Sequence, residues 1–400
     1  MKKYILFIVA VVFLLSAVSC ASTPKDTGDF ECEFDKKAKT ATITGYNGDL
    51  EEIVIPEKFD DYTVTSIGWS AFSKKYNIER IILPETIQTI EASAFEYCIS
   101  LENINFPNSL KSIGNTAFLS CRALLTASIG ENIESLGIGV FSGCTSLDKI
   151  VVNENNKYYS SDSYGVLLDK EQKTLLQYPA GSMSISYNMP DSVVEIAGYA
   201  FEKSEFLEKI TFSDNLKKIG SCAFQNSGIL EASFGDSLEE IGFSCFNESK
   251  ITDVSLGNNV KIIGESAFSW CTSLSEMFIP ASVVEVGQSA FYMCTAIENF
   301  TVDKDNKVYS SDEHGVLYDK QGSILLYYPI GSTRTEYSVL QKTAAISANA
   351  FSPTLFLTKV IIPDSVEKIG DKAFAQCANL NDVVYEGTPP VNIADNAFEK

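Results

Sequence analysis

A phenylalanine, usually preceded by alanine, recurs along this 400-residue chain at an almost constant spacing. Successive anchors lie 22 to 24 residues apart, except for two intervals of 60 residues. A period in this range is typical of a repeat protein, in which each unit buries its apolar side only against its neighbours. We therefore predict one solenoid rather than several globular domains. The anchors are Phe72, Phe95, Phe118, Phe141, Phe201, Phe224, Phe246, Phe268, Phe291, Phe351, Phe374 and Phe398.

Each unit follows one template, L-x-x-I-x-I-P-x-x-V-x-x-I-G-x-x-A-F-x-x-C, as residues 100–118 and 274–291 illustrate. The I-x-I segment alternates at a period of two and predicts a short strand. Pro or Gly ends that strand, and the Gly before the anchor permits a tight corner. Because the anchor recurs in every coil, we interpret the phenylalanine column as core and not as a ligand site.

The repeated I-G-x-x-A-F signature resembles that of the BspA-like, or Treponema-type, leucine-rich repeat family over about residues 50–398. This resemblance implies a β-rich repeat solenoid with one short parallel strand per coil of about 23 residues, on the concave side. It also implies an exported bacterial protein that adheres to host or bacterial surfaces.

Both long intervals contain an insertion, and the two insertions are copies of each other at an offset of 150 residues. Residues 155–167 match residues 305–317. In each copy an apolar run, a polar turn and a second apolar run follow, and this pattern predicts a β-hairpin. We expect these insertions, at about 153–187 and 303–337, to stay attached to the solenoid.

The first 19 residues have the layout of a signal peptide, with a basic start and an apolar stretch too short to span a bilayer comfortably. The run Ala17-Val18-Ser19-Cys20 resembles the lipobox of bacterial lipoproteins, and the resemblance implies a lipid on Cys20. The alternative is a plain signal peptide with an incidental cysteine. We expect residues 20–30 to form a lipid-attached tether, residues 31–49 an N-terminal β cap, and residues 50–400 the solenoid.

Composition argues against most site chemistry. The formal net charge of −21 and the lack of a Lys or Arg cluster disfavour nucleic acid as a partner. His314 is the one histidine, and no nucleophile, phosphate-loop or zinc motif accompanies it. Asp303, Asp305 and Asp312 lack the spacing of a calcium loop, so we interpret them as a solvated acidic loop. We expect no enzyme, no metal site and no cofactor.

Six cysteines follow an anchor by three residues. Because they occupy equivalent template positions, we expect buried free thiols, although thiols one coil apart leave occasional bridging open. These cysteines are Cys98, Cys121, Cys144, Cys271, Cys294 and Cys377.

The candidate binding face consists of two side-chain columns on the predicted strands. The middle residue of I-x-I points away from the core, which gives a mildly apolar column with Phe278 as its best anchor for a partner. That column comprises Ile82, Asn105, Ser128, Val151, Thr211, Ser233, Ser255, Phe278, Thr301, Ile361 and Val384. A polar column beside it comprises Arg80, Asn103, Thr126, Lys149, Lys209, Glu231, Asp253, Glu276, Asn299, Lys359 and Asp382. The columns indicate either a long recognition surface or simply the usual preferences of exposed strands.

Three functional hypotheses remain from the sequence. The first is a lipid-anchored cell-surface protein that binds a protein ligand, such as host extracellular matrix or another cell surface, through its solenoid. The second is a structural or assembly protein of the cell envelope without a host ligand. The third is a glycan-binding module, for which we would expect more aromatic residues than the strand columns carry.

The lipobox gives a first prediction. We expect Cys20→Ser to release the protein into the medium, because an attached lipid contributes about 0.8 kcal/mol per buried CH₂ to membrane binding. Cell fractionation and immunoblotting would measure this. A variant that stays in the membrane fraction as fully as the unaltered protein would contradict lipid attachment at Cys20.

Overall fold

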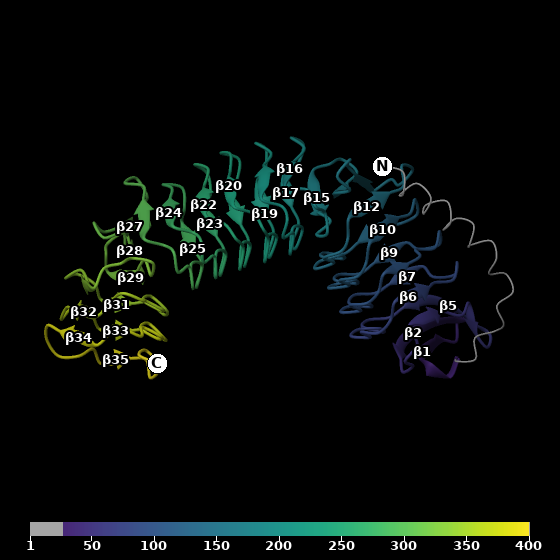
Figure 1. The fold of residues 1–400 in the computed structure, drawn as a ribbon, viewed down its shortest axis with the longest axis horizontal. Coiled ribbons are helices and arrows are strands. Elements are labelled where there is room, and N and C mark those ends of the chain that lie inside the picture. The colour runs from purple at the N-terminus through teal and green to yellow at the C-terminus, as the bar shows by residue number, and fades with distance from the viewer. Residues whose placement is uncertain (1–26, 400) are drawn as a thin grey trace.

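The computed structural model describes residues 27–399, which form an arch of stacked coils (Figure 1). The predicted solenoid is confirmed. The expected signal peptide, Cys20 and the tether up to residue 26 lie outside the described residues. Across residues 27–399, the structure has no helix that could cross a membrane.

The predicted I-x-I strands are present, and they form one face, which we call the outer strands. Neighbouring outer strands pair in parallel and in register, as between Thr126 and Lys149. The outer strands are β3 (Glu52–Val54), β6 (Arg80–Ile82), β8 (Asn103–Ile104), β10 (Thr126–Ile129), β12 (Lys149–Val152), β16 (Ser186–Asn188), β18 (Lys209–Thr211), β20 (Glu231–Ser233), β22 (Asp253–Ser255), β24 (Glu276–Ile279), β26 (Asn299–Val302), β30 (Glu336–Ser338), β32 (Lys359–Ile362) and β34 (Asp382–Tyr385).

Each coil also contributes a second short strand, which the sequence analysis did not identify. These inner strands precede the corner that leads to the anchor. They are β5 (Tyr62–Ile67), β7 (Thr89–Ile90), β9 (Ser112–Ile113), β11 (Ser135–Leu136), β15 (Thr174–Gln177), β17 (Glu195–Ile196), β19 (Lys218–Ile219), β21 (Glu240–Ile241), β23 (Ile262–Ile263), β25 (Glu285–Val286), β29 (Ile324–Tyr327), β31 (Ala345–Ile346), β33 (Lys368–Ile369) and β35 (Asn392–Ile393).

The concave position implied for the I-x-I strands is wrong. Figure 1 shows β20, β22 and β24 toward the outer edge of the arch, and β19, β23 and β25 toward its inner edge. Hydrogen bonding gives the physical reason. The inner strands form three sheets that break only at the insertions, whereas the outer strands fall into five shorter sheets. Coils are therefore most tightly joined along the inner strands, and the stack curves toward them.

An antiparallel hairpin precedes the first full coil. After a short 3-10 helix, η1 (Thr27–Asp29), strand β1 (Phe30–Asp35) pairs with β2 (Thr40–Tyr46). Strand β2 then pairs in parallel with β5, and the short strand β4 (Lys58–Phe59) pairs antiparallel with β5. The hairpin thus extends the first inner sheet and packs Tyr46 on Phe72, with ring centroids 5.7 Å apart.

The anchor phenylalanines stack in a column through the core. Neighbouring rings lie nearly parallel, and Phe224 stacks on Phe201 and Phe246 with centroids 4.7 and 4.9 Å apart. Phe224 has no exposed surface. The interpretation of this column as core is therefore confirmed by burial and ring contact.

Both insertions contain the predicted hairpin, with one further strand. In the first copy β13 (Tyr159–Ser161), β14 (Leu167–Asp169) and β15 pair antiparallel in that order. In the second copy β27 (Tyr309–Ser311), β28 (Leu317–Asp319) and β29 repeat the arrangement. Strands β15 and β29 then join the inner sheets by parallel pairing with β17 and β31.

Each insertion ends in a coil whose anchor is tyrosine, which the sequence analysis missed. Tyr178 stacks on Phe201 at 5.2 Å, and Tyr328 stacks on Phe351 at 5.0 Å. Both tyrosines stand 23 residues before the next phenylalanine, so the period itself was the available signal. Buried side chains accordingly group into three clusters, which divide at the two insertions.

The cysteines that follow the anchors are free, as expected. Their thiols donate to the carbonyl oxygen of the anchor in the preceding coil, as Cys121 does to Phe95 at 3.1 Å. Burial raises the pKa of Cys98 to about 12. These thiols therefore stay protonated and unreactive at neutral pH.

The stacked column generates a stability prediction. We expect Phe224→Ala to lower the free energy of unfolding by about 3–5 kcal/mol, because it leaves a cavity between two rings. Phe243→Ala serves as the control, since that side chain is 49% exposed and should change stability by less than about 1 kcal/mol. Urea unfolding would measure both. Equal losses for the two variants would contradict the assigned register.

Candidate functional site

The two candidate columns on the outer strands point to solvent, as the alternation of the sequence predicts. In β10 the order is Thr126 exposed, Ala127 buried, Ser128 exposed and Ile129 buried. The same alternation runs through β24, where Phe278 is 44% exposed. Every other candidate residue is exposed except Ile82, Asn299, Lys359, Ile361 and Val384, which are half-buried. The structure therefore brings these side chains together along the strand face of the arch.

Parallel pairing spaces the side chains of each column at the separation of neighbouring strands. Ser128 lies beside Val151, and Ser233 lies beside Ser255. Strands hold exposed side chains in fixed positions, so a partner would meet a preorganised surface. The role of this surface as a binding site stays a prediction.

Asn105 has a structural role within its column. Its side-chain oxygen accepts the Leu83 N–H at 2.8 Å, and its amide nitrogen donates to the Leu83 oxygen at 2.9 Å. The Asn105 amide thus continues the pairing of β6 and β8 beyond the last backbone bond. Because its amide is bonded to the backbone, Asn105 is less available to a partner than Ser128 or Phe278. Among the described residues, the side chains of Ser128 and Phe278 have no such bond to the backbone.

Three outer strands carry face residues that the sequence analysis did not include. Val54 in β3 pairs with Ile82, Asn188 in β16 pairs with Thr211, and Ser338 in β30 pairs with Ile361. All three are exposed. The period was again the available signal for two of them, because Asn188 and Ser338 stand 23 residues before their partners.

The insertions interrupt the face by placing a turn against an outer strand. Ile150 N–H donates to the Gly165 oxygen at 3.1 Å, and Phe300 N–H donates to the Gly315 oxygen at 3.0 Å. Gly165 has a left-handed backbone with φ of +76°, and a Cβ atom there would lie 3.0 Å from Lys149 Cα. Only glycine fits this close approach. The turns therefore separate β12 from β16, and β26 from β30.

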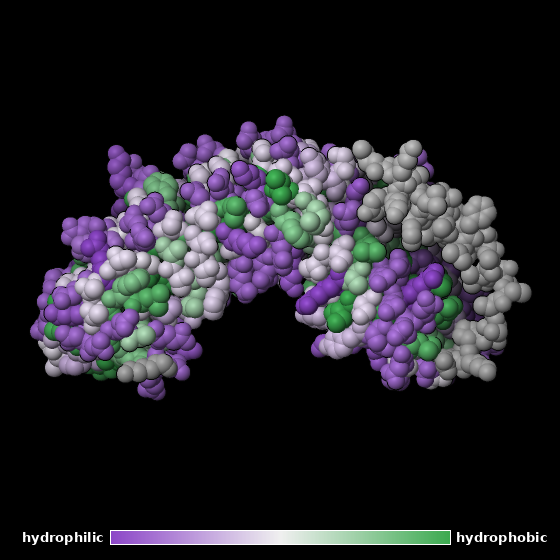
Figure 2. Space-filling view, in the orientation of Figure 1, coloured by the Kyte–Doolittle hydropathy of each residue, from purple (hydrophilic) through white to green (hydrophobic). Residues whose placement is uncertain are grey.

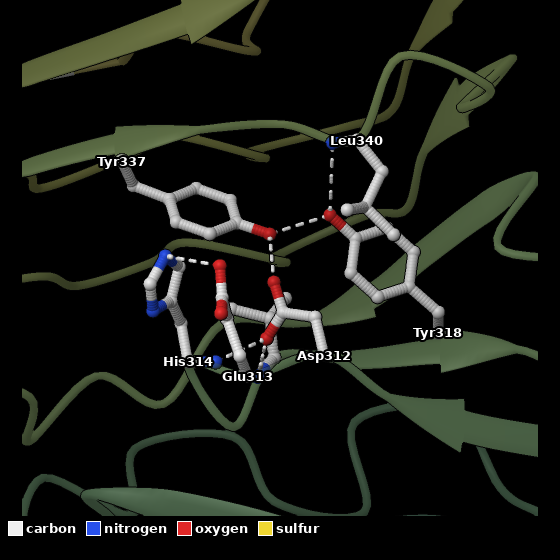
Figure 3. A network of polar contacts seen from close by, with 7 residues as sticks. Asp312, Glu313, His314, Tyr318, Tyr337 and Leu340 are labelled. Atoms are coloured by element: carbon white, nitrogen blue, oxygen red, sulfur yellow. Dashed lines mark hydrogen bonds and ion pairs between the residues drawn. The ribbon is translucent and has the colours of Figure 1, made fainter.

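A buried chain of hydroxyl groups fixes the turn of the second insertion to β30 (Figure 3). The hydroxyl of Tyr337 donates to Asp312 Oδ2 at 2.8 Å. The hydroxyl of Tyr318 lies 2.5 Å from that of Tyr337 and accepts the Leu340 N–H. Burial raises the pKa of Tyr318 to about 12 and moves that of Tyr337 higher still, so both hydroxyls keep their protons at physiological pH.

The first insertion has a simpler version of the same link. Tyr187 donates to Asp162 Oδ2 at 3.0 Å, but Leu168 stands where the second copy has Tyr318. Tyr164 takes the place of His314. The difference makes the second turn the more strongly hydrogen-bonded of the two.

The acidic residues of the second insertion cap turns. Asp303 accepts the Asp305 N–H at 2.8 Å, and Asp312 Oδ1 accepts the N–H groups of His314 and Val316 at 2.9 Å. His314 Nε2 lies 3.8 Å from Glu313 Oε1 at the surface. Within the part of the chain that the structure describes, no group of three or more His, Cys, Asp or Glu side chains could hold a metal ion.

Much of the outer edge of the arch is hydrophilic, and apolar side chains form separate patches on the face in view (Figure 2). The outer strands carry exposed apolar side chains at Val54, Val151 and Phe278, which are 48%, 52% and 44% exposed. Such a surface suits contact with a protein partner at scattered apolar points.

Comparison with known proteins places this geometry in context. The family model described as "BspA type Leucine rich repeat region" matches the chain in six copies, over residues 46–166, 184–312 and 341–400. A search of curated proteins found no match.

Several solved structures of bacterial repeat proteins resemble this one. A leucine-rich repeat protein from Bacteroides ovatus is 22% identical, with a TM-score of 0.48 over 91% of this chain and 94% of the other. The pneumococcal vaccine antigen PcpA is 21% identical, with a TM-score of 0.50 over 90% of this chain and 97% of the other. A protein from Eubacterium ventriosum is 18% identical, with a TM-score of 0.49 over 93% of each chain. At these identities the likeness shows the fold alone.

The tyrosine chain generates a prediction about the second insertion. We expect Tyr337→Phe to lower the free energy of unfolding by about 1.5–3 kcal/mol, because it removes a hydrogen bond to the Asp312 carboxylate. Tyr158→Phe is the control, since Tyr158 is 47% exposed. Urea unfolding would compare them. A loss for Tyr337→Phe no larger than for the control would show that the link does not hold the insertion in place.

Proposed function

Because the chain belongs to the BspA-type leucine-rich repeat family, we propose that it is a lipid-anchored cell-surface protein that binds a protein ligand through its outer strands. The observation that carries this proposal is the pair of exposed columns, which run along strands held in register from coil to coil. The ligand proposed is host extracellular matrix or the surface of another cell.

Three features support a binding role over catalysis. The family model that matches the chain is that of a repeat region, and no catalytic family matches. The two columns form a shallow, mostly polar surface with isolated apolar side chains, which is typical of a protein-binding surface. Solenoids commonly use such extended faces for recognition.

The lipid anchor and the surface location rest on the sequence around Cys20. The lipobox resemblance supports attachment, and the exported layout of the first 19 residues supports passage across the membrane. A structural or assembly role in the cell envelope, without a host ligand, is the second candidate. Protease treatment of intact cells separates the two, because it removes a surface protein and spares one that faces the periplasm.

Binding of the purified protein to immobilised matrix proteins, glycans and whole cells tests the proposal. We expect saturable binding to a matrix protein or to cells. Changing Ser128, Thr211, Ser233 and Ser255 to Glu should abolish it, because the variant puts four negative charges on the outer strands.

The matched control puts the same charge on the inner strands and their flanks. It changes Gln88, Ser135, Thr174 and Ser221 to Glu, and it should bind normally. Loss of binding in both variants would show a general charge effect instead of a site on the outer face. Failure of the correctly folded protein to bind any member of the panel would favour the envelope role.

A further inference from the structure

A hollow of about 810 Å³ opens on the inner strands at the second insertion. It lies where the inner sheet is interrupted, between β25 on one side and β29, β31, β33 and β35 on the other. Figure 1 shows these strands where the arch bends into its C-terminal arm. This volume falls within the range of roughly 300–1,000 Å³ that is usual for ligand sites.

The hollow arises because one coil has a shortened corner. In an ordinary coil the anchor stands five positions after the buried inner-strand residue, as Phe351 does after Ile346. In the insertion coil it stands only three positions after, as Tyr328 does after Leu325. The corner is therefore two residues shorter than those of its neighbours, and it leaves a recess between them. The first insertion has the same shortened corner, from Leu175 to Tyr178.

In the first insertion, side chains of the flanking coils meet across the recess. Ile138 Cγ2 lies 3.3 Å from the position a Cβ atom would take on Gly198, and Tyr199 Cδ2 lies 3.2 Å from that position on Gly139. Ser142 also donates a hydrogen bond to the buried carboxylate of Glu202 across the same joint. The flanking coils therefore fill the first recess themselves.

The second insertion replaces these contacts with small or polar residues. At an offset of 150, Gln288 stands for Ile138, Ser289 for Gly139 and Ala348 for Gly198. On the strand after the insertion, Ala345 stands where the first copy has an exposed glutamate, Glu195. These positions no longer carry the contacts of the first copy. The joint is bridged instead by Tyr327, whose hydroxyl accepts the Ala290 N–H at 2.9 Å and donates to the Gly287 oxygen at 3.2 Å, and the hollow lies beside this side chain.

The lining combines an apolar wall with a polar rim. Val286, Ile324, Leu326 and Tyr327 supply half-buried or exposed apolar surface on both sides of the gap. The rim carries amide, hydroxyl, ammonium and carboxylate groups, from Gln288, Ser289, Ser347, Lys368, Asp371 and Asn392. The one positive and the one negative charge among them balance, so the rim has no net charge.

The rim also offers a backbone donor. In the preceding coils the residue two before the anchor donates its N–H to the next coil, as Ser266 does to Gln288 at 3.0 Å. Ser289 holds the same place beside the shortened corner, and its N–H has no acceptor within residues 27–399. A ligand oxygen in the hollow would satisfy it.

We propose that this hollow binds a neutral oligosaccharide. A sugar ring presents an apolar face and a perimeter of hydroxyl groups, which matches an apolar wall inside an uncharged rim of mixed donors and acceptors. An anionic ligand would meet a single lysine offset by Asp371, in a chain whose net charge is −21. A purely apolar ligand would leave six polar side chains unpaired.

This site is separate from the proposed protein-binding face. It uses the inner strands, whereas the proposed protein ligand contacts the outer strands. The proposal of a sugar ligand can therefore be tested independently of the proposal of a matrix or cell-surface ligand.

Isothermal titration calorimetry of the purified protein tests the site with maltotetraose, cellotetraose, mannotetraose and chitotetraose, and with tetragalacturonate as an acidic comparator. We expect saturable binding of at least one neutral tetrasaccharide. Ala345→Glu should weaken it about tenfold or more, because a carboxylate would enter the apolar part of the hollow. Glutamate is compatible with the fold at this strand position, since Glu195 occupies it in the first copy.

Two controls separate the site from a general effect. Glu195→Ala, the reciprocal change in the first copy, should leave binding unchanged. The variant with Ser128, Thr211, Ser233 and Ser255 changed to Glu should also bind the sugar normally, even where it has lost a protein ligand. The proposal is overturned if no neutral tetrasaccharide binds, if tetragalacturonate alone binds, or if Ala345→Glu binds as tightly as the unaltered protein.

Discussion

Contact between neighbouring coils holds this protein together, since no coil can bury its own apolar side. At the anchor turn the N–H groups of Ser93, Phe95 and Tyr97 donate to the next coil at 3.0, 2.8 and 2.7 Å. Ser93 and Tyr97 have left-handed backbones, with φ of 55° and 58°. Such residues are costly outside glycine, but they turn three N–H groups toward one neighbour. The bonds and the stacked rings offset that cost in the regular coils.

At the two insertions, the contact between neighbouring coils differs from that in the rest of the arch. The inner strand just before each insertion has no partner strand on the side of the insertion. A tyrosine hydroxyl accepts a backbone N–H of that strand instead. Tyr159 accepts the Leu136 N–H and Tyr309 accepts the Val286 N–H, both at 2.8 Å. The hydrophobic core divides at these points into three clusters. The insertions thus keep the coils in one arch while creating surfaces that regular coils cannot form.

The two strand faces consequently differ in what they can recognise. The outer strands present long columns of small polar and isolated apolar side chains, interrupted by the insertion turns. Their shape suits a broad partner that contacts several coils. The inner strands are continuous between the insertions and mostly carry charged or polar side chains, but at the second insertion they line a hollow. The hollow lies beside a shortened corner, where Gln288 and Ala345 stand at the positions of Ile138 and Glu195 in the first copy.

The amino-acid sequence by itself determined the period, the stacked core and the exposure of the outer columns. It could do so because every coil meets the same neighbours, so one template predicts burial at each position, from Phe224 to Ser128. Tertiary structure alone decided the direction of curvature, because that depends on which strands stay hydrogen-bonded from coil to coil. It also decided that the first recess is filled. That outcome depends on contacts across an insertion, such as Ile138 with Gly198, which no single repeat contains.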